Sequence, residues 1–164
     1  MKITKLPKMG HVGIVVENLE KALDELKMIY NLPGLDKSRI FSYRPQKVMA
    51  WGKEVKDSEI RICVADWYDG MTMEILQFVS GEIEHDKFVR DTGGGIHHIQ
   101  HLVKEYEAYC AFMLERGGVP TFEAEAEDNR GYRRCTYFRM PITNAVIEIA
   151  EAPRFRDASG KLMD

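Results

Sequence analysis

Two segments of the chain share one order of apolar and polar positions. Residues 11–16 (HVGIVV) and residues 98–103 (HIQHLV) align at an offset of 87 residues. Each begins as a short β-branched, apolar run, which predicts a strand. Each continues with apolar residues at helical spacing, which predicts an amphipathic helix packed on that strand. The chain therefore contains an internal repeat.

Three further strand patterns follow each predicted helix. In the first half they cover roughly residues 37–43, 60–66 and 71–79. In the second half they cover roughly residues 121–126, 133–140 and 145–150. Residues 44–59 are charged and irregular, and we interpret them as a long loop. Each half is then a βαβββ module.

These patterns predict a single domain over residues 1–164. One module covers about 9–79 and the other about 96–151, with a polar linker at 80–95, a helical turn near 86–90 and a loosely held tail at 152–164. The predicted fold class is α+β, with the two modules forming a half-open, eight-stranded, mixed and barrel-like sheet. Helices cover its outer face, so the concave inner face is left to enclose a cavity for a ligand.

Strand parity places two histidines on the inner face. Because alternate side chains point to opposite faces, His11 faces the cavity when the apolar set of its strand faces the helix. The same argument turns His98 and Gln100 inward. His97 is expected on the opposite face from His98, unless the strand begins one residue differently. We expect His101 on the helix side and His85, in the linker, to be solvated.

One carboxylate lies in the last predicted strand of each half. Glu74 interrupts the apolar run MTMEILQF, and Glu148 interrupts NAVIEIA. A buried carboxylate is costly unless a charge or a metal compensates it. Two histidines and two carboxylates suit Mn, Fe, Co, Ni or Zn, with positions left open for water or substrate. The repeat thus predicts a divalent metal site of His11, Glu74, His98 and Glu148.

Composition narrows the classes of partner. Lys and Arg number 23 against 26 for Asp and Glu, a net charge of −3, which argues against nucleic-acid binding. No stretch reaches the ~18 apolar residues of a membrane helix, and residues 1–7 lack the apolar core of a signal peptide. We therefore expect a cytoplasmic protein. The 3 cysteines are far apart and are expected to be free thiols.

These residues resemble the vicinal oxygen chelate superfamily, which includes glyoxalase I, methylmalonyl-CoA epimerase, extradiol dioxygenases and the fosfomycin and bleomycin resistance proteins. The resemblance covers about residues 9–151 and is strongest to methylmalonyl-CoA epimerase and its relatives. It rests on GHVGIVV at 10–16, MEIL at 73–76, GGIHHI at 94–99 and VIEI at 146–149. By position it implies a metal bound by His11, His98, Glu148 and Glu74, the set that strand parity also selects.

The resemblance implies proton abstraction next to a carbonyl or thioester. A metal would act as the Lewis acid, and Glu148 or Glu74 as the base. The second base of the epimerases falls on one of Glu54, Asp57 and Glu59, among which the sequence does not choose.

Substrate and assembly follow from the same resemblance. Gln100 and the inward-facing member of the pair Arg133 and Arg134 are candidates for substrate binding, and such an arginine would pair with a carboxylate or phosphate. The implied substrate is a small molecule, with an acyl-CoA as the leading example. A homodimer is the expected assembly.

Other functions stay open at this level. A glyoxalase I-like lactoylglutathione lyase needs a single base that moves a proton between adjacent carbons. An iron-dependent dioxygenase needs two histidines and one carboxylate, so Glu74 counts against it. A non-catalytic small-molecule binder of the resistance type often lacks the ligand set. Fold alone does not separate these functions.

Overall fold

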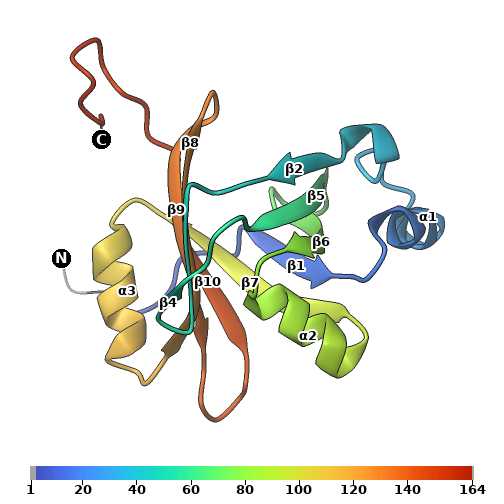
Figure 1. Ribbon diagram of the computed structural model, residues 1–164, viewed down its shortest axis with the longest axis horizontal. Helices are drawn as coiled ribbons and strands as arrows, with labels where there is room; N and C mark the ends of the chain where they lie inside the picture. The colour runs from blue at the N-terminus through green and yellow to red at the C-terminus, as the bar shows by residue number, and fades with distance from the viewer. Residues whose placement is uncertain (1–2, 164) are drawn as a thin grey trace.

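The computed structural model describes residues 3–163 and shows one mixed sheet of 10 strands (Figure 1). The first half contains β1 (His11–Val15), α1 (Leu19–Tyr30), the short 3-10 helix η1 (Lys37–Arg39), β2 (Phe41–Tyr43), β3 (Lys47–Ala50), β4 (Lys53–Glu54), β5 (Glu59–Asp66) and β6 (Thr72–Ser80). The second half contains α2 (Glu84–Thr92), β7 (Gly95–Val103), α3 (Tyr106–Leu114), β8 (Val119–Asp128), β9 (Gly131–Arg139) and β10 (Val146–Glu151).

The two halves meet at the strands that the repeat identifies. The strand order is β2-β5-β6-β1-β7-β10-β9-β8-β3-β4, in which β1 and β7 pair antiparallel at the centre. Each of these strands also pairs in parallel with the last strand of its own half, β1 with β6 and β7 with β10. The predicted α+β fold with two repeated modules is confirmed, with a hairpin added at one edge.

That hairpin, β3–β4, corrects the prediction of a loop over residues 44–59. β3 pairs with β8 although β2 pairs with β5, so the chain crosses from one edge of the sheet to the other (Figure 1). Val48 and Ala50 alternate with exposed or half-buried neighbours and enter the interior cluster, which explains why a charged segment forms a strand. Residues 37–43 form η1 and β2 rather than one strand.

Helix α1 covers the outer face of the first half. Asn18 caps it by accepting a hydrogen bond from the Lys21 backbone N–H at 2.9 Å. Its buried Leu19 and Leu23 pack in one cluster with Ile14, a helix-facing residue of β1. Strand parity is therefore correct for β1. Removing these apolar contacts from water stabilises the layer by about 25 cal/mol per Å².

Helix α3 covers the second half in the same way. Phe112 and Met113 pack against Val103 of β7 and Ile149 of β10. A different cluster, with Val15 and Phe122 among its members, fills the space enclosed by the curved sheet. The inner side chains are therefore separated from both outer helices by the sheet.

Helix α2 is longer than the predicted turn near residues 86–90, and it packs against the interior cluster through Phe88 and Val89. His85, in its first turn, is completely buried, so the expectation of a solvated linker histidine is wrong. The predicted loose tail is tied to β9 where the Arg154 N–H donates to the Tyr132 carbonyl at 3.0 Å, and most of it is exposed. Over residues 3–163, every helix is too short or too polar to cross a bilayer.

Candidate metal centre

Four side chains from the two modules converge inside the sheet. His11, Glu74, His98 and Glu148 each offer one ligand atom, and these atoms all lie within 4.8 Å of one another. The His11 Nε2 atom is 3.0 Å from His98 Nε2, 3.1 Å from Glu148 Oε2 and 3.2 Å from Glu74 Oε2. The structure thus brings together the residues that the repeat selects; we call them the quartet below.

The register of the sheet explains the convergence. In the parallel pair of β1 and β6, His11 lies opposite Thr72, two positions before Glu74. In the parallel pair of β7 and β10, His98 lies opposite Val146, two positions before Glu148. Each module therefore places its carboxylate diagonally across from its histidine, and the antiparallel pairing of β1 with β7 brings the two sets face to face.

The quartet fits a divalent cation. Glu148 is buried, and its Oε2 atom finds no hydrogen-bond partner in the described part of the chain although it lies 3.1 and 3.3 Å from the two histidines. An unsatisfied buried carboxylate oxygen is costly, and a cation bound between it and the imidazoles would remove that cost. Nitrogen and oxygen donors in this ratio suit Mn, Fe, Co, Ni or Zn.

The quartet also shifts its own protonation equilibria. Burial lowers the pKa of His98, but the neighbouring Glu148 and Glu74 carboxylates outweigh burial and raise it to about 9. Burial also lowers the pKa of His11, and the same two carboxylates outweigh burial, so the pKa of His11 is raised. For Glu148 burial raises the pKa, and the two histidines reverse this and lower it. Without metal, the site therefore holds ionised carboxylate beside imidazolium.

A cavity of about 190 Å³ reaches the two carboxylates of the quartet. Gln100 lines it and donates from Nε2 to Glu148 Oε1 at 3.2 Å, which fixes that carboxylate. The rest of the wall is largely apolar and aromatic: Phe41, Tyr43, Ile60, Ile62, Leu76, Leu102, Phe122 and Cys135. This space is the candidate substrate site, because it combines apolar walls with a few convergent polar groups.

Tyr137 is a residue that the sequence argument missed. Its hydroxyl lies 3.4 Å from His98 Nε2, and its buried ring lines the cavity. Burial and the neighbouring carboxylates raise its pKa, so the hydroxyl keeps its proton. Parity along β9 from Arg133 would have found Tyr137, since residues two and four positions apart share a face.

The two candidate arginines differ in their surroundings. Arg133 lies on the inward-facing side of β9, lines the cavity and donates to both carboxylate oxygens of Asp128 at 2.9 Å. Arg134 pairs with Glu151 at 2.7 Å and with Glu107 of α3 at 2.5 Å, although part of it reaches the rim of the cavity. Arg133 is thus the better placed of the two.

The candidate second bases lie elsewhere. The carboxylates that line the cavity, within the described residues, belong to Glu74, Glu148 and Glu151. Glu59 accepts hydrogen bonds from Ser42 and Arg44, and Glu54 is exposed on β4. Asp57 sits in a turn with a positive φ of 56°. The fold brings none of these three acids to the cavity.

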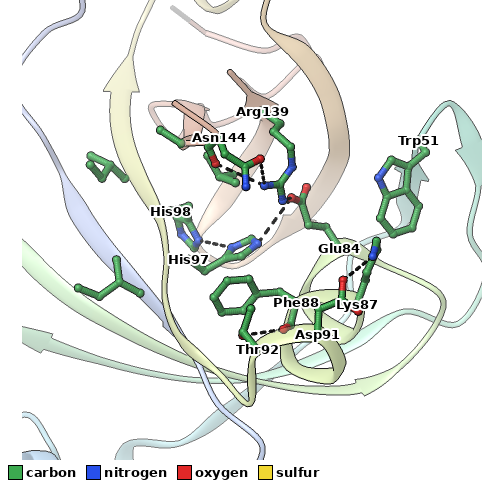
Figure 2. Close-up of a pocket in the computed structure, with 14 residues that line it drawn as sticks. Trp51, Glu84, Lys87, Phe88, Asp91, Thr92, His97, His98, Arg139 and Asn144 are labelled. Carbon is green, nitrogen blue, oxygen red and sulfur yellow. Dashed lines mark hydrogen bonds and ion pairs between the residues drawn. The ribbon is translucent and has the colours of Figure 1, made fainter. Parts of the chain in front are cut away.

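His97 corrects a prediction of side-chain direction. The β1–β7 pairing shifts at this point, with Gly13 opposite His98 and Ile14 opposite Ile96, so His97 is the extra residue of a β-bulge. The bulge turns His97 to the same side as His98, with the two Nδ1 atoms 3.1 Å apart. Both rings line a second cavity of about 590 Å³ that also contacts α2 (Figure 2).

Comparisons with known proteins agree with this architecture. A model of the Glyoxalase/Bleomycin resistance protein/Dioxygenase superfamily matches residues 10–137. A search of curated protein sequences found no match.

Solved structures of similar shape include methylmalonyl-CoA epimerase from Mycobacterium tuberculosis, with 18% identity, a TM-score of 0.61 and coverage of 93% of this chain and 94% of that one. A variant of Streptomyces coelicolor methylmalonyl-CoA epimerase in complex with 2-nitronate-propionyl-CoA shows 17% identity, a TM-score of 0.55 and coverage of 90% and 99%. A variant of 4-hydroxymandelate synthase from Streptomyces coelicolor shows 14% identity, a TM-score of 0.58 and coverage of 89% and 49%. At these identities the likeness shows the fold.

Proposed function

Because the chain belongs to the glyoxalase/bleomycin resistance protein/dioxygenase superfamily, we propose that it is a metal-dependent epimerase or isomerase that removes a proton next to a carbonyl or thioester. The proposed reaction is of the type that methylmalonyl-CoA epimerase catalyses. The observation that carries this proposal is the convergence of His11, Glu74, His98 and Glu148 within 4.8 Å of one another, beside a cavity.

In this proposal the quartet holds one divalent cation. Such a cation, when bound, supplies Lewis-acid polarisation of a substrate carbonyl and stabilises negative charge that develops on its oxygen. Gln100 orients the Glu148 carboxylate by donating from Nε2 to its Oε1 atom at 3.2 Å. His11 and His98 provide the imidazole ligands from the central strand pair.

Glu74 is the proposed base. Its side chain is the most exposed of the quartet, at 15% against 7% for Glu148, and it lines the cavity. It would accept the proton from the substrate carbon next to the carbonyl. Epimerisation then needs a proton for the opposite face of the carbon. Glu148, from the mirror-related module, is the group proposed to supply it: in its protonated form it would give its proton to the carbon and become the carboxylate, while Glu74 keeps the first proton. The buried Tyr137 hydroxyl would donate a hydrogen bond to the substrate oxygen.

The cavity size supports a small reacting group. At about 190 Å³ it is below the roughly 300–1,000 Å³ typical of sites for drug-sized ligands. An acyl-CoA would therefore place only its acyl end inside, with the rest of the molecule over the surface. Arg133 at the wall would pair with a carboxylate on that acyl group. The apolar walls exclude water from the reacting carbon.

A glyoxalase-type isomerisation is the second candidate. It needs one base rather than two, and the absence of Glu54, Asp57 and Glu59 from the lining of the cavity favours it. Both candidate reactions use the quartet as the metal site and Glu74 as the base, so the two are distinguished by which substrate the protein converts.

Hydrogen exchange tests the proposal. The metal-loaded protein is incubated with methylmalonyl-CoA in deuterated water, and deuterium at the carbon next to the thioester is measured by mass spectrometry. We expect incorporation that disappears with a chelator and in His98→Ala, and that survives in His101→Ala. Turnover of a glutathione hemithioacetal without exchange into the acyl-CoA would favour the second candidate. No reaction with either substrate would contradict the proposal.

A further inference from the structure

A row of polar groups, buried except for a half-buried arginine at its end, runs behind the quartet, on the side away from the substrate cavity. Figure 2 shows His98, His97, Glu84 and Arg139 following one another along it. His98 Nδ1 lies 3.1 Å from His97 Nδ1, and His97 Nε2 lies 3.8 Å from Glu84 Oε1. Arg139 donates to Glu84 from its guanidinium. The row joins β7 to the first turn of α2 and to β9.

The proton positions on the two rings are linked through the contact between their Nδ1 atoms. The Nε2 atom of His98 faces the carboxylates of the quartet, at 3.3 Å from Glu148 and 3.6 Å from Glu74. To bind a cation there, Nε2 must present a lone pair, and the proton of a neutral imidazole must then sit on Nδ1. His97 Nδ1 is the atom placed to accept that proton in a hydrogen bond.

Glu84 determines where His97 carries its own proton. If His97 Nδ1 accepts, its own proton sits on Nε2, which faces the Glu84 carboxylate. Glu84 is buried and is held by Arg139 of β9. At 3.8 Å the two atoms are too far apart for a hydrogen bond, and His97 Nε2 has no other partner in the described residues, but the negative charge of the carboxylate favours the tautomer with hydrogen on Nε2. The ion pair between α2 and β9 therefore sets the tautomer of His97, and His97 sets that of His98.

We infer that His97 is a positioning residue for the metal site: it accepts the Nδ1–H of His98 and so turns the His98 Nε2 lone pair toward the quartet. This inference rests on the proposed metal site. The β-bulge at residue 97 is the structural device that makes it possible, because an unbulged strand would send the two rings to opposite faces.

His85 has a different place in the same cluster. Its ring packs 5.1 Å from the His97 ring and is fully buried, but neither of its nitrogens meets a partner within the described residues. One nitrogen of each of His85, His97 and His98 lies within 4.8 Å of the other two, close enough together to hold a second metal ion. A second cation there would use His98 Nδ1 as a ligand, and that atom then would not donate to His97. The two arrangements exclude each other and are separable by experiment.

Two nearly isosteric variants test the role of His97. In His97→Asn the amide oxygen occupies the place of Nδ1 and still accepts a hydrogen bond, whereas His97→Leu removes the acceptor. Zn²⁺ affinity is measured by competition with a chromogenic chelator, with His101→Leu as the control for losing another buried histidine of β7. We expect His97→Leu to bind Zn²⁺ roughly 10–100-fold more weakly, with His97→Asn and the control within about threefold of the wild type.

A spectroscopic measurement keeps the inference testable if His97→Leu fails to fold. Nitrogen NMR of the Zn²⁺-loaded wild-type protein identifies the protonated nitrogen of each histidine, and we expect hydrogen on His98 Nδ1. Equal weakening in both His97 variants, no weakening in either, or two Zn²⁺ ions per chain with metal on His98 Nδ1 would overturn the inference. A wild-type protein that binds no Zn²⁺ would instead reject the proposed function.

Discussion

Gly13 lies opposite His98 in the β1–β7 pair, and a Cβ atom on Gly13 would stand only 2.0 Å from Cε1 of the His98 ring. The ring nitrogens would be 2.3 and 2.4 Å away. The His98 ring therefore occupies the space that any other residue at position 13 would need. A single missing side chain in one module makes room for a proposed ligand from the other.

Replacing Gly13 with alanine should damage the metal site before it damages the fold. Because His98 is enclosed on every side, its ring must leave the quartet to admit the new methyl group. We expect Gly13→Ala to weaken Zn²⁺ binding at least 100-fold and to lower Tm, since overpacking typically costs about 1–3 kcal/mol. Val12→Ala, on the outer face of β1, is the control and should keep its metal affinity. Wild-type affinity in Gly13→Ala would show that His98 does not bind the ion.

Glu74→Gln should separate metal binding from proton transfer. The amide retains an oxygen ligand but cannot accept a proton from carbon. We expect metal content to persist and solvent exchange into the substrate to fall by about 10²–10⁴-fold. Glu54→Gln, on exposed β4, provides a matched control with normal exchange. If Glu74→Gln exchanged at the wild-type rate, the base would have to be another group.

The metal-free protein should show a characteristic pH dependence. His98 has a pKa of about 9 in the fold against an ordinary value of 6.5, so its stabilising contribution is complete below pH 6.5 and is lost as the pH rises through about 9. The difference in unfolding free energy between the wild type and His98→Asn should therefore shrink between pH 6.5 and 9, by up to a few kcal/mol. Denaturant titrations in a chelator provide the measurement. A difference that is constant over this range would contradict the ion pairing within the quartet.

Glu148 should act in the opposite direction at low pH. Its pKa is lowered in the fold, so its contribution is present above its ordinary value of 4.5 and is lost as the pH falls below it. The same titrations on Glu148→Gln should show less acid sensitivity than the wild type. Parallel acid unfolding curves for the two proteins would argue against this role.

Arg133 and Arg134 should respond differently to the same substitution. Arg133→Met removes a cation from the cavity wall, and we expect a higher KM for a carboxylate-bearing substrate with a small change in Tm. Arg134→Met removes a partner of the buried Glu151, so we expect a loss of about 1–3 kcal/mol of stability with an unchanged KM. Steady-state kinetics and thermal unfolding test both. Equal effects of the two variants on KM would contradict the assignment of Arg133.

The quartet was predictable from sequence because the repeat and strand parity are local signals. His11 and His98 occupy equivalent positions in β1 and β7, and Glu74 and Glu148 interrupt equivalent apolar runs. Their roles as ligands stay a prediction. Local patterns were sufficient to predict the quartet because the parallel pairs β1–β6 and β7–β10 have the same register between histidine and carboxylate.

The missed features depend on contacts distant in sequence. The β3–β4 hairpin is held in place because β3 pairs with β8. This pairing sets Lys47 opposite Glu125, a residue more than seventy positions later in the sequence. His97 changes face through a bulge, which inserts one residue and inverts the parity beyond it. His85 looked solvated among charged neighbours, and it is buried because α2 packs its first turn into the interior.

Metal stoichiometry is the most direct test of whether the quartet binds an ion. Purified wild-type protein and a His11→Ala, Glu148→Gln double variant are loaded with Zn²⁺, freed of excess ion and analysed by elemental mass spectrometry alongside circular dichroism. We expect one tightly bound ion per wild-type chain and none in the folded double variant. Equal metal content in the two proteins, or none in a folded wild-type chain, would contradict it.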